Sequence, residues 1–238
     1  PKKLVAILAT GLLLLNMSIW CPILLALAFI KVIIPLKAWH KLITPVITKV
    51  AEIWVYGNSA WMALTQKTHW DVQGLGNLQY KGWYLINANH QSWVDILVLQ
   101  HVFKGKIPLL KFFLKQELIK VPVMGLCWWA LDFPFMKRFS KDFLAKHPEM
   151  RGKDLETTRI ACEKFSQMPT SVMNFMEGTR FTPKKHAKQQ SPYTHLLKPK
   201  AGGIAFAMNA MGGKFQSLLN ITIVYPDGIP TFVDFLSG

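Results

Sequence analysis

The sequence contains few cysteines, no internal repeats and few acidic residues. Its three cysteines, Cys21, Cys127 and Cys162, form no C-x-x-C pair and no evident disulfide framework, which is typical of a protein in a reducing compartment. No group of His, Cys and Asp residues has the spacing of metal ligands, so we expect no metal site. The sequence therefore disfavours a disulfide-rich scaffold, a repeat array and a metalloprotein.

The chain is strongly basic, with 13 Asp and Glu against 28 Lys and Arg and a net charge of +15. Such an excess indicates an anionic partner: nucleic acid, an acidic membrane surface or a phosphate-bearing substrate. Apolar residues make up 51% of the chain and the mean hydropathy is positive, which favours a membrane-associated protein over a solvated nucleic-acid binder. No nucleic-acid-binding motif appears. We therefore expect anionic membrane lipids, and no nucleic acid, as partners.

A long uncharged run opens the chain. Residues 4–30 contain no charged side chain and exceed the ~20 residues that a membrane-spanning helix needs. A signal peptide would have a shorter apolar core and a small-residue cleavage site. Pro22 falls inside the run and can kink or break a helix. Because lysines flank both ends, the charges give no orientation, and a hairpin dipping into one leaflet and a single kinked span both stay open.

The next segment, residues 40–67, carries apolar side chains at three- and four-residue spacings. This pattern predicts an amphipathic helix, suited to a membrane interface or to packing on the domain. We therefore predict a membrane-anchoring helical segment over residues 1–67 and an α/β domain over residues 68–238. The chain starts without Met and stops just after an apparent strand, so both termini are expected to be incomplete.

Beyond residue 68, short apolar runs typical of strands alternate with helical patterns, which predicts an α/β fold with a mostly parallel sheet flanked by helices. Strands are expected at residues 70–73, 83–88, 107–110, 132–135, 169–176, 218–225 and 231–235. Helices are expected at residues 93–99, 112–118, 154–166 and 201–211. The lysine-rich residues 182–200 are expected to form an irregular loop, with a lid or a docking surface for anionic lipid or cofactor as the sharper alternative.

One predicted strand-to-helix turn carries a histidine, His90, between the strand at residues 83–88 and the next helix. Ser92 is a good helix N-cap, and Asp95 stands three residues later, where a capping-box acid would be. Side chains in a first helical turn tilt toward the residues before the helix, so a His90–Asp95 contact is expected. The carboxylate would fix the imidazole tautomer and leave one ring nitrogen as a general base. A plain helix cap is the alternative reading.

Two further strand ends carry charged groups. The strand at residues 169–176 leads into the E-G-T-R sequence at residues 177–180, and the strand at residues 132–135 leads into the cations at positions 137–138. Ligands collect at the carboxyl ends of strands in open α/β sheets, and arginine suits bidentate phosphate contacts. Taken alone, the pair at positions 137–138 fits a solvated turn better than a phosphate site.

These segments, in this order and spacing, resemble the glycerolipid acyltransferase family, specifically its 1-acyl-glycerol-3-phosphate acyltransferases. The family's N-H-x-x-x-x-D block matches Asn89, His90 and Asp95, its F-P-E-G-T-R block matches Phe175 and residues 177–180, and its F-I-x-R block matches Phe135, Lys137 and Arg138. Residues 221–226 are similar to a hydrophobic block ending in proline, and residues 198–203 to a K-x-G segment. Met176 and Met136 replace the usual proline and isoleucine, which are apolar exchanges.

The resemblance implies roles for the matched residues. His90, oriented by Asp95, would be the general base, and Arg138 and Arg180 would bind a phosphate. The glycerol site would be shaped by Glu177, Gly178 and Thr179, with Lys115 adding positive charge. The reaction implied is acyl transfer from acyl-CoA or acyl-carrier protein to lysophosphatidate, giving phosphatidate, with no metal and no bound cofactor.

The same resemblance implies an inner or cytoplasmic membrane location, with the site on the cytoplasmic side. Other acceptors are the nearest alternatives: glycerol-3-phosphate, a lysophospholipid or a lipid A precursor. A basic membrane adaptor without catalysis is the alternative from another class, and the intact His90/Asp95 pair argues against it.

Overall fold

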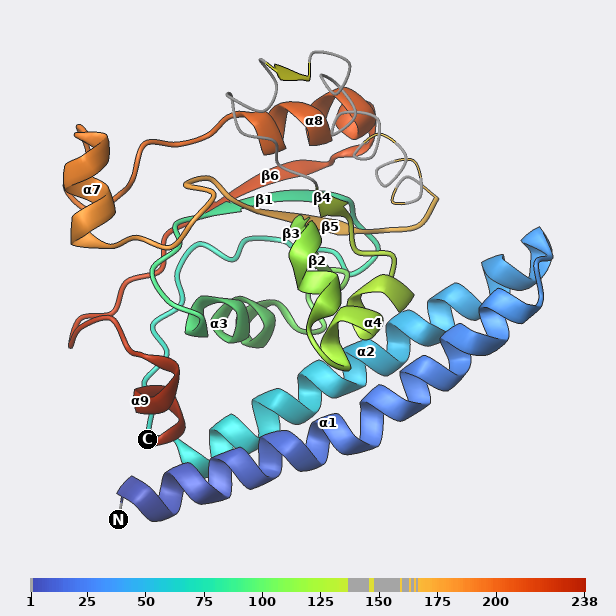
Figure 1. Cartoon of the computed structure of the whole chain (residues 1–238), viewed down its shortest axis with the longest axis horizontal. Helices are drawn as coiled ribbons and strands as arrows, with labels where there is room; N and C mark the ends of the chain where they lie inside the picture. The colour runs from blue at the N-terminus through green and yellow to red at the C-terminus, as the bar shows by residue number, and fades with distance from the viewer. Residues whose placement is uncertain (1, 137–145, 148–158, 160–162, 164, 166) are drawn as a thin grey trace.

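A computed structural model describes residues 2–136, 146–147, 159, 163, 165 and 167–238 (Figure 1). Two long N-terminal helices lie on one side of a parallel sheet, and a shorter helix, α8, covers its other side. The helices are α1 (Lys2–Ile33), α2 (Lys37–Thr65), α3 (Val94–Phe103), α4 (Met124–Ala130), α7 (Pro183–Gln189), α8 (Gly202–Met211) and α9 (Phe232–Leu236), with 3-10 helices at Gln116–Lys120 and Gly212–Lys214. The strands are β1 (Tyr84–Ala88), β2 (Leu110–Phe112), β3 (Leu114–Lys115), β4 (Phe135–Met136), β5 (Ser171–Phe175) and β6 (Ser217–Ile221).

The main sheet has four parallel strands in the order β2-β5-β1-β6, which confirms the predicted α/β fold. Ala88, the last residue of β1, stands opposite Phe175 of β5 and Ile221 of β6. The carboxyl ends of these three strands are therefore level at one edge of the sheet. Any polar group that follows one of them in sequence comes close to those that follow the others.

Strand β1 is buried along its whole length, as expected for the centre of a sheet covered on both faces. Its side chains alternate between two cores. Ile86 and Ala88 belong to the core that α1, α2 and α4 share with the sheet, whereas Leu85 joins the core beneath α8. Leu24 of α1 and Ile47 of α2 lie in the same core as Ile86, so the N-terminal helices and the sheet are packed together. The division at residue 67 stays a prediction.

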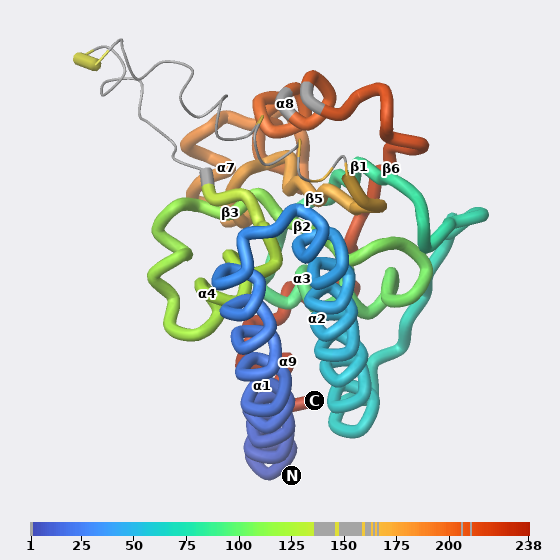
Figure 2. The backbone as a smooth tube through the Cα atoms, turned by 90° about the vertical axis from the view of Figure 1, so that its right-hand side faces the viewer, coloured from blue at the N-terminus to red at the C-terminus, as the bar shows by residue number. Residues whose placement is uncertain are grey.

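The N-terminal segment forms a hairpin of two helices. Helix α1 continues through Pro22 without a break, and the chain reverses only after Ile33, so α2 runs back alongside α1 (Figure 2). Asn16 of α1 donates a hydrogen bond to Asn58 of α2 at 2.9 Å inside this pair. By length and composition, α1 alone among the described helices is long and apolar enough to cross a membrane.

Several predicted elements have a different structure. Residues 70–73 form no strand, and the helix expected at residues 112–118 is replaced by strands β2 and β3 and a 3-10 helix, because residues 110–112 pair with β5. The loop expected at residues 182–200 contains α7, in which Pro183 occupies a first-turn position and Thr182 caps the helix.

The strand expected at residues 231–235 is also wrong, because this segment is helix α9. Thr231 and Asp234 form a capping box, and this local helix signal outweighs the apolar alternation. Lys137, Arg138 and nearly all of the helix predicted at residues 154–166 lie outside the described residues.

Candidate active site

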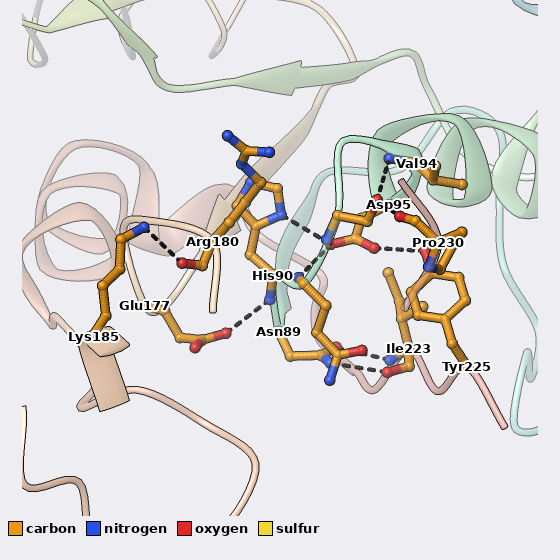
Figure 3. Close-up of polar contacts among 12 residues, drawn as sticks. Asn89, His90, Val94, Asp95, Glu177, Arg180, Lys185, Ile223, Tyr225 and Pro230 are labelled. Carbon is orange, nitrogen blue, oxygen red and sulfur yellow. Dashed lines mark hydrogen bonds and ion pairs between the residues drawn. The ribbon is translucent and has the colours of Figure 1, made fainter. Parts of the chain in front are cut away.

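Three turns meet at the carboxyl edge of the sheet (Figure 3). His90 follows β1, Glu177 follows β5 and Tyr225 follows β6. The level ends of these strands bring the turns together. The position agrees with the expectation that functional groups collect at this edge in open α/β sheets.

The predicted His90–Asp95 contact is confirmed. The Nδ1 atom of His90 lies 2.9 Å from Oδ2 of Asp95, which stands in the first turn of α3. When Nδ1 carries the proton and donates to the carboxylate, Nε2 is left as an acceptor. In that tautomer the imidazole has the free nitrogen that a general base needs.

Asp95 is completely buried and accepts three further hydrogen bonds. The backbone amides of Gln91 and Ser92 donate to Oδ2 at 2.6 and 2.9 Å, and the Tyr225 hydroxyl donates to Oδ1 at 2.6 Å. Burial raises the pKa of Asp95, but the bonds from His90, Tyr225 and the two amides outweigh burial and lower it below the ordinary value. Burial, followed by the Asp95 carboxylate, raises the pKa of Tyr225, so the tyrosine remains a donor.

Ser92 is not the N-cap that the sequence suggests. Helix α3 begins at Val94, and Trp93 occupies the cap position without a side-chain bond. The Ser92 hydroxyl instead donates to the carbonyl oxygen of Pro230 at 2.6 Å and accepts from the Val94 amide at 3.2 Å. The serine thus ties the turn to the segment that follows β6.

Glu177 is a second buried acid, 2% exposed, between two backbone amides. Its Oε1 accepts from the His90 amide and its Oε2 from the Leu197 amide, both at 2.8 Å. The carboxylate therefore supports the main chain of His90. Gly178 follows with a φ of 66°, a left-handed conformation that favours glycine. Thr179 accepts a bond from the Lys185 ammonium group at 2.8 Å.

The histidine ring is also held on its face. The imidazole of His90 stacks on Phe175, with ring centroids 3.9 Å apart and 13° between the planes. Asn89, the preceding residue, exchanges two hydrogen bonds with the backbone of Ile223, at 2.9 and 2.8 Å. Asp95 at the ring edge and Phe175 at the ring face together leave the imidazole little freedom to turn.

Of the predicted cationic residues, Arg180 lies beside the His90 turn and Lys115 lies on β3. The exposed guanidinium of Arg180 lies over the ring of Trp93, 4.6 Å from its centroid, and so beside the His90 turn. Lys115 is exposed on β3, opposite Met136 of β4. It therefore stands next to the residue that precedes Lys137 and Arg138 in the chain, which lie outside the described residues.

Sequence reasoning missed Tyr225, Phe175 and Ile223 as parts of this site. A tyrosine directly before the proline of the last apolar block was the available signal for Tyr225, because a polar hydroxyl at the end of a buried strand needs a partner. Phe175 lies in the matched F-P-E-G-T-R block but was given no role, and Ile223 carried no such signal. Their roles follow only from the pairing of β1 with β5 and β6.

The chain is similar to several known proteins. Residues 69–226 match the model of a family described as Acyltransferase. The chain is 25% identical over 173 residues to 1-acyl-sn-glycerol-3-phosphate acyltransferase gamma from Mus musculus, covering 68% of this chain and 44% of the mouse protein. It is 24% identical over 165 residues to the probable 1-acyl-sn-glycerol-3-phosphate acyltransferase 5 from Arabidopsis thaliana, covering 65% of this chain and 41% of the plant protein. The chain thus spans less than half of these relatives.

A solved structure is similar in fold. The crystal structure of the 1-acyl-sn-glycerophosphate (LPA) acyltransferase PlsC from Thermotoga maritima superposes with a TM-score of 0.54 at 19% sequence identity. The superposition covers 89% of this chain and 72% of the Thermotoga protein. At this identity the likeness establishes the fold.

Proposed function

This chain belongs to the acyltransferase family, and from that membership we propose that it transfers a fatty acyl group from an acyl thioester to the free hydroxyl of lysophosphatidate, giving phosphatidate. The relatives' names support this choice of acceptor. The observation that carries the proposal is the His90–Asp95 pair, with its carboxylate fully buried and held by four donors.

The proposed chemistry uses the free ring nitrogen of His90. Nε2 accepts the proton of the acceptor hydroxyl while the hydroxyl oxygen bonds to the thioester carbonyl carbon. The resulting tetrahedral oxyanion collapses, the carbon–sulfur bond breaks, and the leaving thiolate takes the proton from Nε2. Asp95 stabilises the imidazolium that exists between these two proton transfers, and its depressed pKa keeps it ionised in that role.

Binding of the acceptor is assigned to the cationic strand ends. Arg180 and Arg138 hold the phosphate, with Lys115 adding positive charge, because a guanidinium can form two parallel bonds to phosphate oxygens. The backbone turn at residues 177–180 lines the glycerol. Acyl-CoA or acyl-carrier protein supplies the acyl group, and the proposed reaction uses no metal and no bound cofactor.

The proposed location is the inner or cytoplasmic membrane, with the active site on the cytoplasmic side. Helix α1 supports membrane attachment through its exposed apolar side chains, including Leu4, Ile7, Leu14 and Leu15. The net charge of +15 suits an anionic bilayer as well as anionic substrates.

The test is acyl transfer from acyl-CoA to lysophosphatidate by detergent-solubilised protein. Wild type, His90→Ala and His101→Ala are compared; His101 lies at the other end of α3 and stacks on Trp70. We expect His90→Ala to lose at least the ~10²–10⁴-fold that a general base contributes, with His101→Ala active. Equal activity in all three would remove His90 as the base. Inactive wild type with acyl-CoA and with acyl-carrier protein would point to another acceptor, then to an adaptor.

A further inference from the structure

The chain between Glu177 and Asp227 contains no acidic residue, although it includes Arg180 and six lysines. Four of these lysines are exposed and define a surface that we call the basic rim: Lys184, Lys188, Lys198 and Lys200. None of their ammonium groups has an ion-pair or hydrogen-bond partner within the part of the chain that the structure describes. The basic rim therefore presents uncompensated positive charge.

The basic rim is joined to the candidate active site at both ends. At its start, the Lys185 ammonium group donates to Thr179 at 2.8 Å and to the carbonyl oxygen of Arg180 at 2.9 Å. At its far end, the Leu197 amide donates to Glu177, whose other oxygen holds the His90 amide. A molecule bound on the basic rim would thus sit beside the turn that carries the proposed base.

The basic rim does not lie on the side of the apolar helix α1. Helix α7, which carries Lys184 and Lys188, lies at one end of the sheet and apart from α1 in Figure 1. If the exposed apolar side chains of α1 contact lipid, α7 does not lie on that lipid surface. In that arrangement a soluble anion fits the basic rim better than an anionic lipid does.

The arrangement of the charges favours a protein over a nucleotide. Lys184 and Lys188 are four residues apart and so lie on one face of α7, which stands outside the sheet (Figure 1). The Lys198 amide donates to the side chain of Gln189 at 3.0 Å, so the returning segment lies against the end of α7. A row of ammonium groups on an outward-facing helix matches an extended acidic surface, whereas a nucleotide is bound in a concave pocket.

We propose that the basic rim docks an acidic acyl-carrier protein, which delivers the acyl thioester to His90. This rests on the proposed function and selects, from its two possible donors, the one that carries an acidic protein surface. Docking at the rim places the thioester arm of the carrier next to the turn at residues 177–180 and leaves the side of α1 free for the lipid acceptor.

The test is the double variant Lys184→Glu/Lys188→Glu, assayed with both donors. With acyl-carrier protein we expect kcat/KM to fall about tenfold or more, mainly through KM, and the wild-type value to fall with added salt. With acyl-CoA we expect no change in kcat/KM. This donor has the same acyl chain and the same acceptor, but it has no carrier protein to dock on the basic rim. Lys67→Glu/Lys81→Glu is the charge-matched control, because both lysines are exposed in the segment between α2 and β1.

Binding is measured in parallel by fluorescence anisotropy of labelled acyl-carrier protein, which requires no turnover. Weaker binding to the rim variant than to wild type and control supports docking. Equal binding, or an equal loss of activity with both donors, overturns it. Absence of turnover with either donor in the wild type contradicts the proposed function alone, and the binding assay still decides the docking.

Discussion

Two buried carboxylates in this molecule each accept a hydrogen bond from a tyrosine hydroxyl. Asp95 accepts a hydrogen bond from the Tyr225 hydroxyl at 2.6 Å, and Glu52 of α2 accepts from the Tyr80 hydroxyl at 2.6 Å. Asp95 is 0% exposed and Glu52 is 8% exposed. In both pairs burial, and then the carboxylate, raises the pKa of the tyrosine. A buried acid that is hydrogen-bonded to a tyrosine thus occurs at both of these places in the described part of the chain.

The two sites differ in their other partners. Glu52 is completed by the ammonium group of Lys49, an exposed residue of the same helix, at 3.1 Å. Asp95 is completed by the imidazole of His90 and by two amides of the same turn. The first set neutralises a charge, whereas the second holds a titratable ring with one nitrogen free. The imidazole of His90, rather than the buried acid, therefore makes the surroundings of Asp95 a candidate catalytic site.

Removing the charge of each carboxylate should separate the two sites most clearly. In Asp95→Asn the amide nitrogen can face Nδ1 of His90 and favour the opposite tautomer, so we expect kcat to fall by roughly 10⁴-fold. In Glu52→Gln the proposed chemistry is untouched, and we expect an unchanged kcat per folded molecule. Steady-state kinetics and circular dichroism of both variants test this. A similar loss in both would mean that the acids act only through stability.

A second test concerns the cations near the two acids. Arg180→Ala removes the proposed phosphate contact, and we expect KM for lysophosphatidate to rise about 10–100-fold, the equivalent of a charge-assisted hydrogen bond. KM for the acyl donor should not change. Lys49→Ala removes the cation beside Glu52 and should leave both values as in wild type. An unaltered acceptor KM in Arg180→Ala would take Arg180 out of the phosphate site.

The two tyrosine hydroxyls should also contribute differently at the two sites. In Tyr225→Phe we expect kcat to fall about tenfold with KM unchanged, since one hydrogen bond to the Asp95 carboxylate is lost. Tyr80→Phe should reduce the free energy of unfolding and leave kcat per folded molecule unchanged, because Tyr80 bonds to Glu52 and not to Asp95. An unchanged kcat in Tyr225→Phe would reduce Tyr225 to a packing role.

The smallest expected effect is on stability at low pH. The pKa of Asp95 in the folded protein is below its ordinary value, because the hydrogen bonds to its carboxylate outweigh its burial. Its ionised form therefore stabilises the fold above about pH 4, and this stabilisation is lost as the pH falls through the folded pKa. Each pKa unit corresponds to about 1.4 kcal/mol.

This effect is measured by denaturant unfolding in detergent across the acid range. The background is Asp234→Asn, because the Thr231 side chain and amide also lower the pKa of Asp234. Adding Asp95→Asn should flatten the decline in unfolding free energy with falling pH. A slope that stays the same would assign the acid sensitivity to other groups.

The parts of the site that were predicted correctly are local in sequence. His90 and Asp95 are five residues apart in one strand–turn–helix unit, so elementary helix geometry placed them in contact. Strands β1 and β5 were found because buried parallel strands read as continuous apolar runs. The roles proposed for Arg138, Arg180 and Lys115 stay predictions.

The parts that were missed depend on segments far apart in the chain. No local pattern shows that Tyr225 follows a strand lying beside β1, so its bond to Asp95 could not be foreseen. Helices α7 and α9 were missed for a different reason. Their N-cap residues, Thr182 and Thr231, were present, but lysine content and apolar alternation were given more weight than capping.

The long-range hydrogen bonds that hold the His90 turn also determine the stage of folding at which the turn can form. They join Asp95 to Tyr225, Asn89 to Ile223 and Ser92 to Pro230, across sequence separations of 130, 134 and 138 residues. Closing such long loops is slow and follows local helix formation. A nascent chain can therefore form its helical hairpin early. The His90 turn can be held in place only after strand β6 and the residues that follow it have been synthesised and have packed against β1. We therefore expect the candidate active site to be among the last parts of this molecule to fold.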